Sequence, residues 1–103
     1  MTITLKVKLF AAFREMAGGR NEVNVKLPKE ATIIELIEEL SKILGEGVKE
    51  ALLDSKTGDV KPLNKILVNG RNVELLQKLS TLLKDGDVVA LFPPVGGGGP
   101  AGI

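Results

Sequence analysis

Residues 32–44 read TIIELIEELSKIL, a stretch in which large apolar side chains recur three and four positions apart. This spacing places the apolar side chains along one side of an α-helix, so we predict an amphipathic helix that packs on a sheet. The apolar stripe consists of Ile33, Leu36, Ile37, Leu40, Ile43 and Leu44. Thr32 and Glu35 have the spacing of a capping box at the helix start, and Gly45 suits its end. Glu38 and Lys42 are spaced to form an ion pair on the solvent-facing side of the helix.

The residues before this helix predict two strands of the sheet. Residues 3–10 alternate apolar and polar side chains, which is typical of a strand with one buried face. A short helix is expected at 11–17, where Gly18-Gly19 stops it. Residues 23–27 repeat the alternation, and Pro28 ends this second strand.

The residues after the helix predict two more strands and leave one segment open. We expect, in order, a short helix at 48–53, a polar loop at 54–62 and a strand at 65–68. Asn69-Gly70 is a turn signal. Residues 73–83 fit either a short strand or a turn of helix. Residues 87–92 are apolar on both faces, which predicts a central strand covered on both sides.

The order of these elements predicts an α+β fold. Strand, strand, helix, strand and last strand is the order of the ubiquitin-like β-grasp. In that fold the first and last strands lie in parallel within a mixed sheet, with one main helix packed across it. A length of 103 residues and a mass of 10.9 kDa fit one domain. We therefore expect a β-grasp domain at 1–92 and a flexible Pro/Gly-rich tail at 93–103.

The composition excludes several classes of function. The chain has no His and no Cys, which removes disulfides, thiol chemistry, the usual zinc sites and His-assisted nucleophiles. We therefore expect a protein that binds no metal and performs no catalysis with its own side chains. The net charge of +1 gives no support for nucleic-acid binding. No apolar stretch is long enough for a membrane span, and the absence of Cys fits a reducing cytoplasm.

The tail changes composition abruptly, to PPVGGGGPAGI at residues 93–103. Pro93 and Pro94 end a strand and continue the chain as a stiff extended path, after which four glycines leave the backbone without side chains. One interpretation is a flexible linker. A G-x-G-x-x-G match is rejected, because no helix follows it. The third interpretation is a slim peptide whose terminal carboxylate reacts inside a partner's narrow channel, where a Cβ would collide.

Two blocks carry a resemblance to a known family. They are VKLFAAFREM at residues 7–16 and LKDGDVVALFPPVGGG at residues 83–98. Over nearly its whole length the chain resembles the MoaD-like small subunit of molybdopterin synthase, within the ThiS/MoaD ubiquitin-like sulfur carriers. By position, Gly97 and Gly98 match the family's terminal Gly-Gly pair.

The resemblance implies a sulfur carrier that binds no cofactor itself. A ubiquitin-activating-like adenylyltransferase (MoeB/ThiF-like) would adenylate Gly98 with ATP, and the glycine would then become a thiocarboxylate. Inserted into a MoaE-like large subunit, it would supply sulfur to the molybdopterin precursor. The alternatives are a carrier for thiamine or tRNA thiolation, a ubiquitin-like protein modifier, and a β-grasp binding module that carries no sulfur.

The resemblance also implies a partner-facing surface and a processing step. Its residues would be Phe10, Phe13, Arg14, Phe92, Pro93, Pro94 and Val95. The alternatives at this point are core packing for the three Phe side chains and a solvated charge for Arg14. Residues 99–103 continue past the family's Gly-Gly end, which leaves three explanations: a protease cuts after Gly98, the extra residues are foreign to the natural protein, or the chain is a paralogue that binds without carrying sulfur. We expect the first, with a mature form that ends at Gly98.

Overall fold

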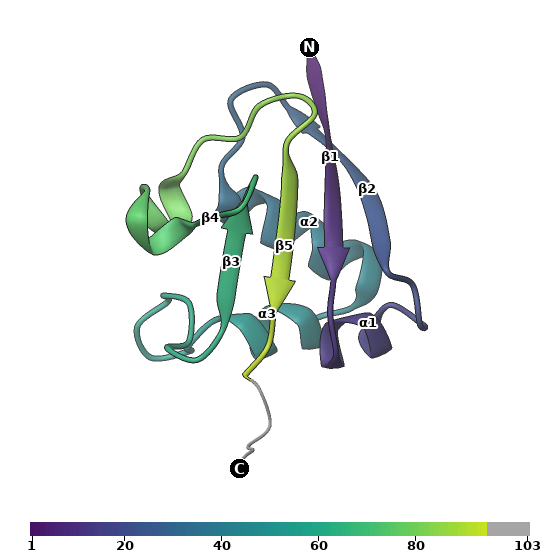
Figure 1. Cartoon of the computed structure of the whole chain (residues 1–103), viewed down its shortest axis with the longest axis vertical. Coiled ribbons are helices and arrows are strands. Elements are labelled where there is room, and N and C mark those ends of the chain that lie inside the picture. Colours follow the sequence, from purple (N-terminus) through teal and green to yellow (C-terminus); the bar gives the residue numbers. More distant parts are fainter. Residues whose placement is uncertain (95–103) are drawn as a thin grey trace.

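Five strands form one mixed sheet in the computed structural model, which describes residues 1–94 (Figure 1). The strands are β1 (Thr2–Leu9), β2 (Glu22–Pro28), β3 (Lys65–Val68), β4 (Arg71–Asn72) and β5 (Val88–Phe92). Their order across the sheet is β2-β1-β5-β3-β4, in which β1 and β5 run parallel and the other neighbours antiparallel. This confirms the predicted ubiquitin-like β-grasp.

The helices lie on one face of the sheet, with α2 across its middle (Figure 1). The helical segments are α1 (Ala12–Met16), α2 (Ile33–Leu44), α3 (Gly47–Leu52) and two 3₁₀ turns, η1 (Val73–Leu75) and η2 (Lys78–Ser80). The segment left open by the sequence therefore forms 3₁₀ turns that follow β4. Val73, Leu76 and Leu79 turn toward the core, and their spacing of three residues matches the 3₁₀ repeat. No helix within residues 1–94 has the length and apolar character needed to cross a membrane.

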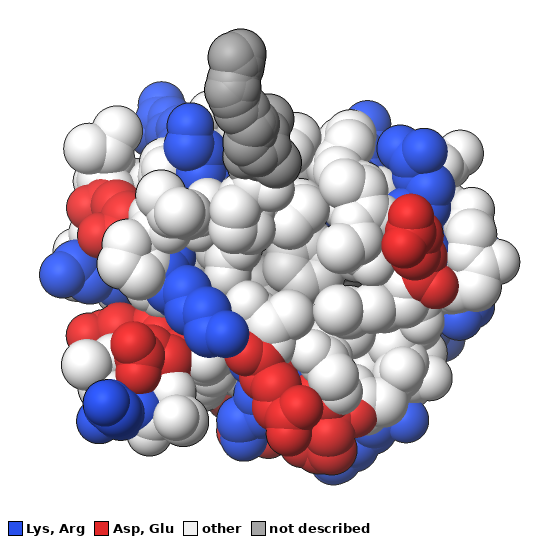
Figure 2. Space-filling view, turned by 90° about the horizontal axis from the view of Figure 1, so that it is seen from below, with Lys and Arg blue, Asp and Glu red and all other residues white. Residues whose placement is uncertain are grey.

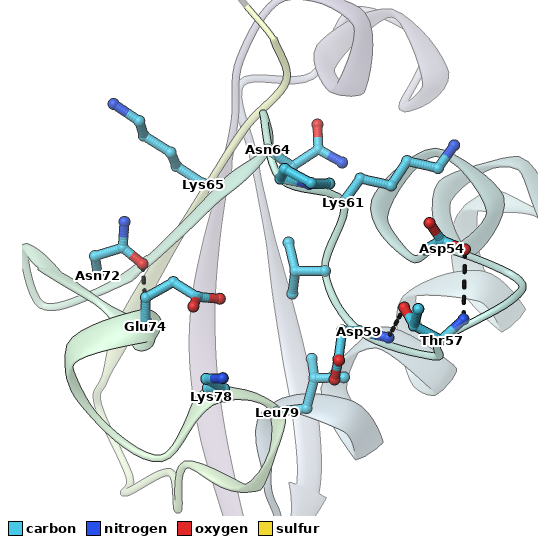
Figure 3. A pocket seen from close by; sticks show the side chains of 12 residues that line it. Asp54, Thr57, Asp59, Lys61, Asn64, Lys65, Asn72, Glu74, Lys78 and Leu79 are labelled. Carbon is cyan, nitrogen blue, oxygen red and sulfur yellow. Dashed lines mark hydrogen bonds between the residues drawn. The ribbon is translucent and has the colours of Figure 1, made fainter.

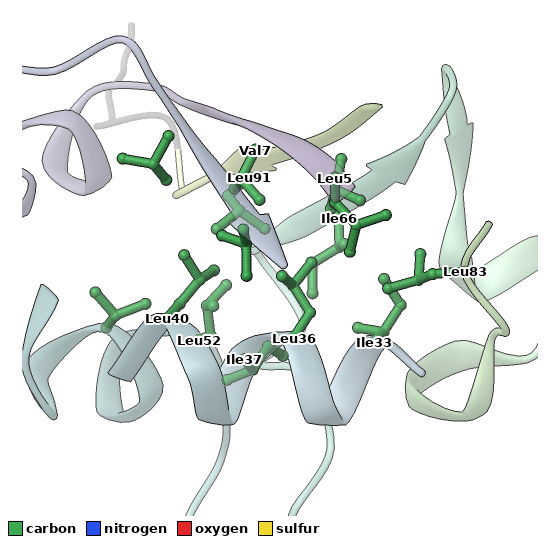
Figure 4. Close-up of a cluster of buried hydrophobic side chains, with 14 of the residues drawn as sticks. Leu5, Val7, Ile33, Leu36, Ile37, Leu40, Leu52, Ile66, Leu83 and Leu91 are labelled. Atoms are coloured by element: carbon green, nitrogen blue, oxygen red, sulfur yellow. The ribbon is translucent and has the colours of Figure 1, made fainter. Parts of the chain in front are cut away.

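The core forms between α2 and the inner face of the sheet (Figure 4). Leu36, Ile37 and Leu40 of α2 face Leu5 and Val7 of β1, and all five side chains are buried. Each such side chain contributes about 1.5–3 kcal/mol when it leaves water. The capping box predicted at the start of α2 is present. Its Glu35 carboxylate accepts the Thr32 backbone N–H at 3.1 Å.

Two predicted details of α2 are wrong. Ile43 does not belong to the buried stripe, because 44% of it is exposed. The predicted Glu38–Lys42 pair does not form either. The Glu38 carboxylate instead accepts a hydrogen bond from Lys49 Nζ of α3 at 2.7 Å, and Lys42 lies 3.8 Å from Glu39. This hydrogen bond raises the pKa of Lys49.

The prediction that β5 is covered on both sides is also wrong. Strand β5 does lie at the centre of the sheet, and its own side chains Val89 and Leu91 are buried on the inner face. On the other face, however, Val88, Ala90 and Phe92 are only half-buried, since the described helices all lie on the opposite side. The sheet therefore presents an open face with an apolar strip along β5.

Candidate functional site

The start of β5 is held in place by the turn Asp85-Gly86-Asp87. Asp85 Oδ1 accepts the Thr4 backbone N–H at 2.7 Å, and the Gly86 N–H donates to the Thr4 carbonyl at 2.9 Å. Asp87 closes the turn by accepting the Lys84 backbone N–H at 2.8 Å. Gly86 has a φ of +87°, which a glycine adopts without strain. The turn thus fixes the register of β5 against β1.

Asn69 fixes β5 from its other side. Its side-chain oxygen accepts the Val88 N–H at 2.9 Å, and its amide donates to Asp87 Oδ1 at 2.9 Å. Asn69 and Gly70 both have positive φ angles and connect β3 to β4, as expected of this turn signal. Because β5 is held in register against both β1 and β3, its last residue, Phe92, has a fixed position.

Phe92 ends β5 and stacks on Phe10, which follows β1. The two ring centroids lie 4.3 Å apart and the ring planes are within 9° of parallel. The parallel register pairs Leu9 with Leu91, so the next residue of each strand lies on the open face of the sheet. Both rings are half-buried. They form a flat apolar platform at the point where the chain leaves the sheet.

A shallow hollow of about 300 Å³ lies beside this platform. It is lined by Leu63, Lys65, Leu67, Phe92 and Pro93. Leu63 is 72% exposed, and Leu67 is half-buried beside Ala90 of β5. We call Phe10, Leu63, Leu67, Phe92 and Pro93 the tail-root surface, because Pro93 is the first residue after β5.

Charged side chains lie on the same end and face of the molecule as the tail-root surface. Figure 2 looks at this end of the molecule, where a wide uncharged area lies beside blue and red side chains. Lys8 of β1 and Lys65 of β3 are exposed on the open face. Arg14 is exposed on α1. An apolar centre inside a polar rim is the usual arrangement of a protein-binding surface.

The predicted partner-facing residues do not all reach this surface. Phe10, Phe92 and Pro93 lie together there, and Pro94 is exposed directly after them. The expectation that Phe13 faces a partner is corrected, because Phe13 is only 1% exposed and packs in the core. Phe13 is the one buried residue of the short α1, so it anchors this helix to the core. Val95, Gly97 and Gly98 lie outside the described residues.

Sequence reasoning missed Leu63 and Leu67. A signal for Leu67 was available, since it takes an outward-facing position between Ile66 and Val68 in a strand that should alternate. Leu63 gave no such signal. It joins the surface only because β3 pairs with β5 and brings the preceding loop beside Phe92.

A larger hollow of about 490 Å³ lies between the loop after α3 and the 3₁₀ turns (Figure 3). Its charged side chains have both signs. The Asp54 carboxylate and the Thr57 hydroxyl hydrogen-bond within their own loop. Asn72 likewise accepts the Glu74 N–H. This hollow therefore offers no set of like charges for one ligand, and residues 1–94 contain no group of metal-ligating side chains.

Comparison with known proteins places the chain in a family. The model of the ThiS family matches residues 7–98. Small archaeal modifier protein 3 of Haloferax volcanii is 36% identical over 94 residues, covering 91% of this chain and 98% of that protein. A provisionally named sulfur carrier protein of Archaeoglobus fulgidus is 33% identical over 96 residues, covering 93% and 100%.

A solved structure gives the same result. The Pyrococcus furiosus protein provisionally assigned as molybdopterin converting factor subunit 1 superimposes with a TM-score of 0.70 at 41% identity. The match covers 90% of this chain and 99% of that one. The family match spans both the β-grasp and the glycine run that follows the tail-root surface. The chain therefore belongs to the ThiS family of ubiquitin-like sulfur carriers and modifiers.

Proposed function

We propose that this chain is a sulfur carrier that delivers sulfur as a thiocarboxylate on Gly98. Removal of the residues after Gly98 would expose its α-carboxylate. The observation that carries the proposal is the tail-root surface, which lies directly where β5 passes into Pro93-Pro94 and the glycine run. A partner that binds this surface also fixes the start of the tail, so that the rest of the tail can extend into the partner's active site.

The tail's composition suits entry into a narrow channel. Two prolines restrict the path of the chain as it leaves the sheet, and glycines present no Cβ to a channel wall. From Pro93 to Gly98 the chain spans at most about 20 Å at ~3.3–3.6 Å per residue. The partner's nucleotide must therefore lie within that distance of the docked surface.

The chemistry requires no catalytic side chain from this protein. In the first step the Gly98 carboxylate oxygen attacks the α-phosphorus of ATP, and pyrophosphate leaves. In the second step hydrosulfide (HS⁻) adds to the acyl carbon, the carbon–oxygen bond to AMP breaks, and the resulting thioacid loses its proton to water. The products are a thiocarboxylate and AMP, and the activating enzyme binds the ATP and the hydrosulfide that are consumed. A chain without His or Cys is suited to this role.

We propose a molybdopterin precursor as the acceptor, with this chain as the small subunit of molybdopterin synthase. The run Phe92-Pro93-Pro94-Val95 and the Pyrococcus furiosus relative support this choice. The large subunit would then bind the same tail-root surface that the activating enzyme uses. The two partners would take turns on the carrier.

A second candidate function is protein modification through the same glycine. The observation that favours it is the 36% identity to Small archaeal modifier protein 3 over nearly the whole of both chains. In that case a lysine amine of another protein would attack the activated Gly98 and form an isopeptide bond. Carriers and modifiers share the adenylation step and differ only in what attacks afterwards.

Intact-mass analysis tests the proposal. The chain ending at Gly98 is incubated with a ThiF-like activating enzyme, ATP and a sulfur donor, and we expect one oxygen to be replaced by sulfur. Gly98→Ala should abolish this product, and Leu67→Ser should raise the KM for activation without changing the fold. The proposal is wrong if the Gly98 form stays unmodified, or if only untrimmed chains occur in the native cells. Gly98 remnants on lysines of other proteins would establish the modifier role.

A further inference from the structure

A hollow at the other end of β5 carries a second apolar cluster. It measures about 610 Å³ and lies between the 3₁₀ turns and the β3–β4 turn. Leu75 and Leu82 both line it, although they are 83% and 61% exposed. Val73 and Leu83, their close neighbours in sequence, are buried and supply the core contacts of this segment. The side chains of Leu75 and Leu82 are therefore not needed for the core. We call this the distal hollow.

Two exposed leucines in one hollow differ from leucines scattered singly over a surface. Single exposed leucines are common and need no explanation, but paired ones in a concave site mark a place where apolar groups bind. Leu76 extends the apolar lining toward the core, against which it is partly buried. The distal hollow thus combines three leucines with polar side chains, among them Asn69 and Gln77.

The free charges around the distal hollow are positive. Arg71 and Lys84 line it, and neither forms an ion pair with any residue in the described part of the chain. The one carboxylate in the lining, that of Asp87, already accepts hydrogen bonds from the Asn69 amide and the Lys84 backbone N–H. A bound ligand would therefore contact two cations without ion-pair partners, Arg71 and Lys84, and one carboxylate, Asp87, that already accepts hydrogen bonds.

The distal hollow and the tail-root surface lie at opposite ends of β5. The distal hollow adjoins Asp87, which precedes β5, whereas the tail-root surface contains Phe92, which ends it (Figure 1). A protein bound at the distal hollow therefore does not compete for the surface around Pro93.

We infer that the distal hollow binds an acidic peptide segment of a partner protein, one that carries at least two large apolar side chains. The apolar side chains contact Leu75 and Leu82, and the acidic residues pair with Arg71 and Lys84. This inference does not depend on the fate of Gly98. It assigns the carrier a second point of attachment that stays available while the tail is inside an enzyme.

Titration of isotope-labelled full-length chain by NMR tests the inference. The probe is a synthetic twelve-residue peptide that alternates pairs of leucines with pairs of glutamates, and its twin has lysine at every acidic position. We expect the acidic peptide to shift the amide signals of Arg71, Leu75 and Leu82, and the lysine twin to bind at least about tenfold more weakly.

Matched variants locate the binding site. Both Leu75→Ser/Leu82→Ser and Arg71→Glu/Lys84→Glu change exposed side chains, so the fold should survive, and each should weaken binding at least about tenfold. Leu63→Ser changes an equally exposed leucine of the tail-root surface and should leave peptide binding unchanged. The inference is overturned if neither peptide binds at millimolar concentration, if both bind equally, or if the shifts centre on Phe92. Loss of activation in Leu63→Ser with normal peptide binding would separate the two proposals.

Discussion

At the scale of single residues, the stack of Phe10 on Phe92 links the fold to the site. Phe92 ends β5 and Phe10 directly follows β1, and the rings meet because the parallel register, which pairs Leu9 with Leu91, brings the next two residues side by side. A flat pair of half-buried rings gives a partner a large apolar contact that loses little side-chain entropy on binding.

Replacing Phe10 by Leu tests the stack. The substitution keeps an apolar side chain but removes the ring contact, which contributes about 0.5–1.5 kcal/mol beyond its buried area. We expect the free energy of unfolding to fall by about 1 kcal/mol and the KM of the Gly98 form for its activating enzyme to rise. Urea denaturation and steady-state kinetics measure the two effects. An unchanged KM would remove Phe10 from the tail-root surface.

Asn64 is a second residue with a defined task. Its buried side-chain amide donates to the carbonyls of Ala51 at 2.7 Å and Leu52 at 3.2 Å, and so ties the start of β3 to the end of α3. Asn64→Ala should lower the free energy of unfolding by about 1–3 kcal/mol, because it removes two hydrogen bonds, although the Leu52 carbonyl keeps the Lys61 N–H as a donor. The exposed Asn21→Ala serves as the control in the same urea series. Equal midpoints for the two variants would contradict this role.

At the scale of elements, the sequence predicted those whose periodicity is strong. Helix α2 and strands β1 and β2 follow their apolar spacing closely, and no bound differs from the prediction by more than one residue. The 3₁₀ turns and the short β4 were not predicted, because two or three residues are too few to show a period. The Glu38–Lys49 contact was also missed, since it depends on how α3 folds back against α2.

Two substitutions on α2 test which residues form its buried stripe. Leu40 is fully buried, whereas Ile43, three residues later in the same helix, is 44% exposed. Leu40→Ala should therefore destabilise the fold by about 2–5 kcal/mol. Ile43→Ala should cost no more than about 1 kcal/mol. Thermal unfolding of the two variants in parallel makes the comparison, and similar losses would restore Ile43 to the core.

The α2–α3 contact predicts a pH dependence. The hydrogen bond to Glu38 raises the pKa of Lys49 above its ordinary value of 10.5. A raised pKa in the folded state means that the contact stabilises fully below that ordinary value and is lost as pH rises through the raised one. Glu38→Gln should therefore reduce stability slightly at neutral pH and not at strongly alkaline pH. The contact is exposed, so added salt should diminish the difference.

At the scale of the whole molecule, the five strands and the buried cluster described above all lie within residues 1–94. We therefore expect a chain ending at Pro94 to unfold within about 0.5 kcal/mol of the full-length protein. Urea denaturation of both forms at equal concentration measures the difference. A clearly lower midpoint for the shorter chain would show that the tail contributes to the fold, and would change the domain boundary expected at residue 92.

The candidate site was predictable only in part. The composition change at Pro93 indicated where it begins, and Phe92 precedes it directly in the sequence. Phe13 was assigned to the same surface, but it fills the core beneath α1, and no local pattern distinguishes the two roles for one ring. Leu63 and Leu67 reach the site through the pairing of β3 with β5, which is a contact between distant parts of the chain.

The parallel pairing of β1 with β5 also determines how the molecule responds to force. The beginning of β1 and the end of β5 lie at opposite ends of the sheet. Tension between the N-terminus and the tail therefore loads all the hydrogen bonds between these strands together, in shear, rather than opening them one at a time. An enzyme that pulls on the tail should therefore need a high force to unfold the domain.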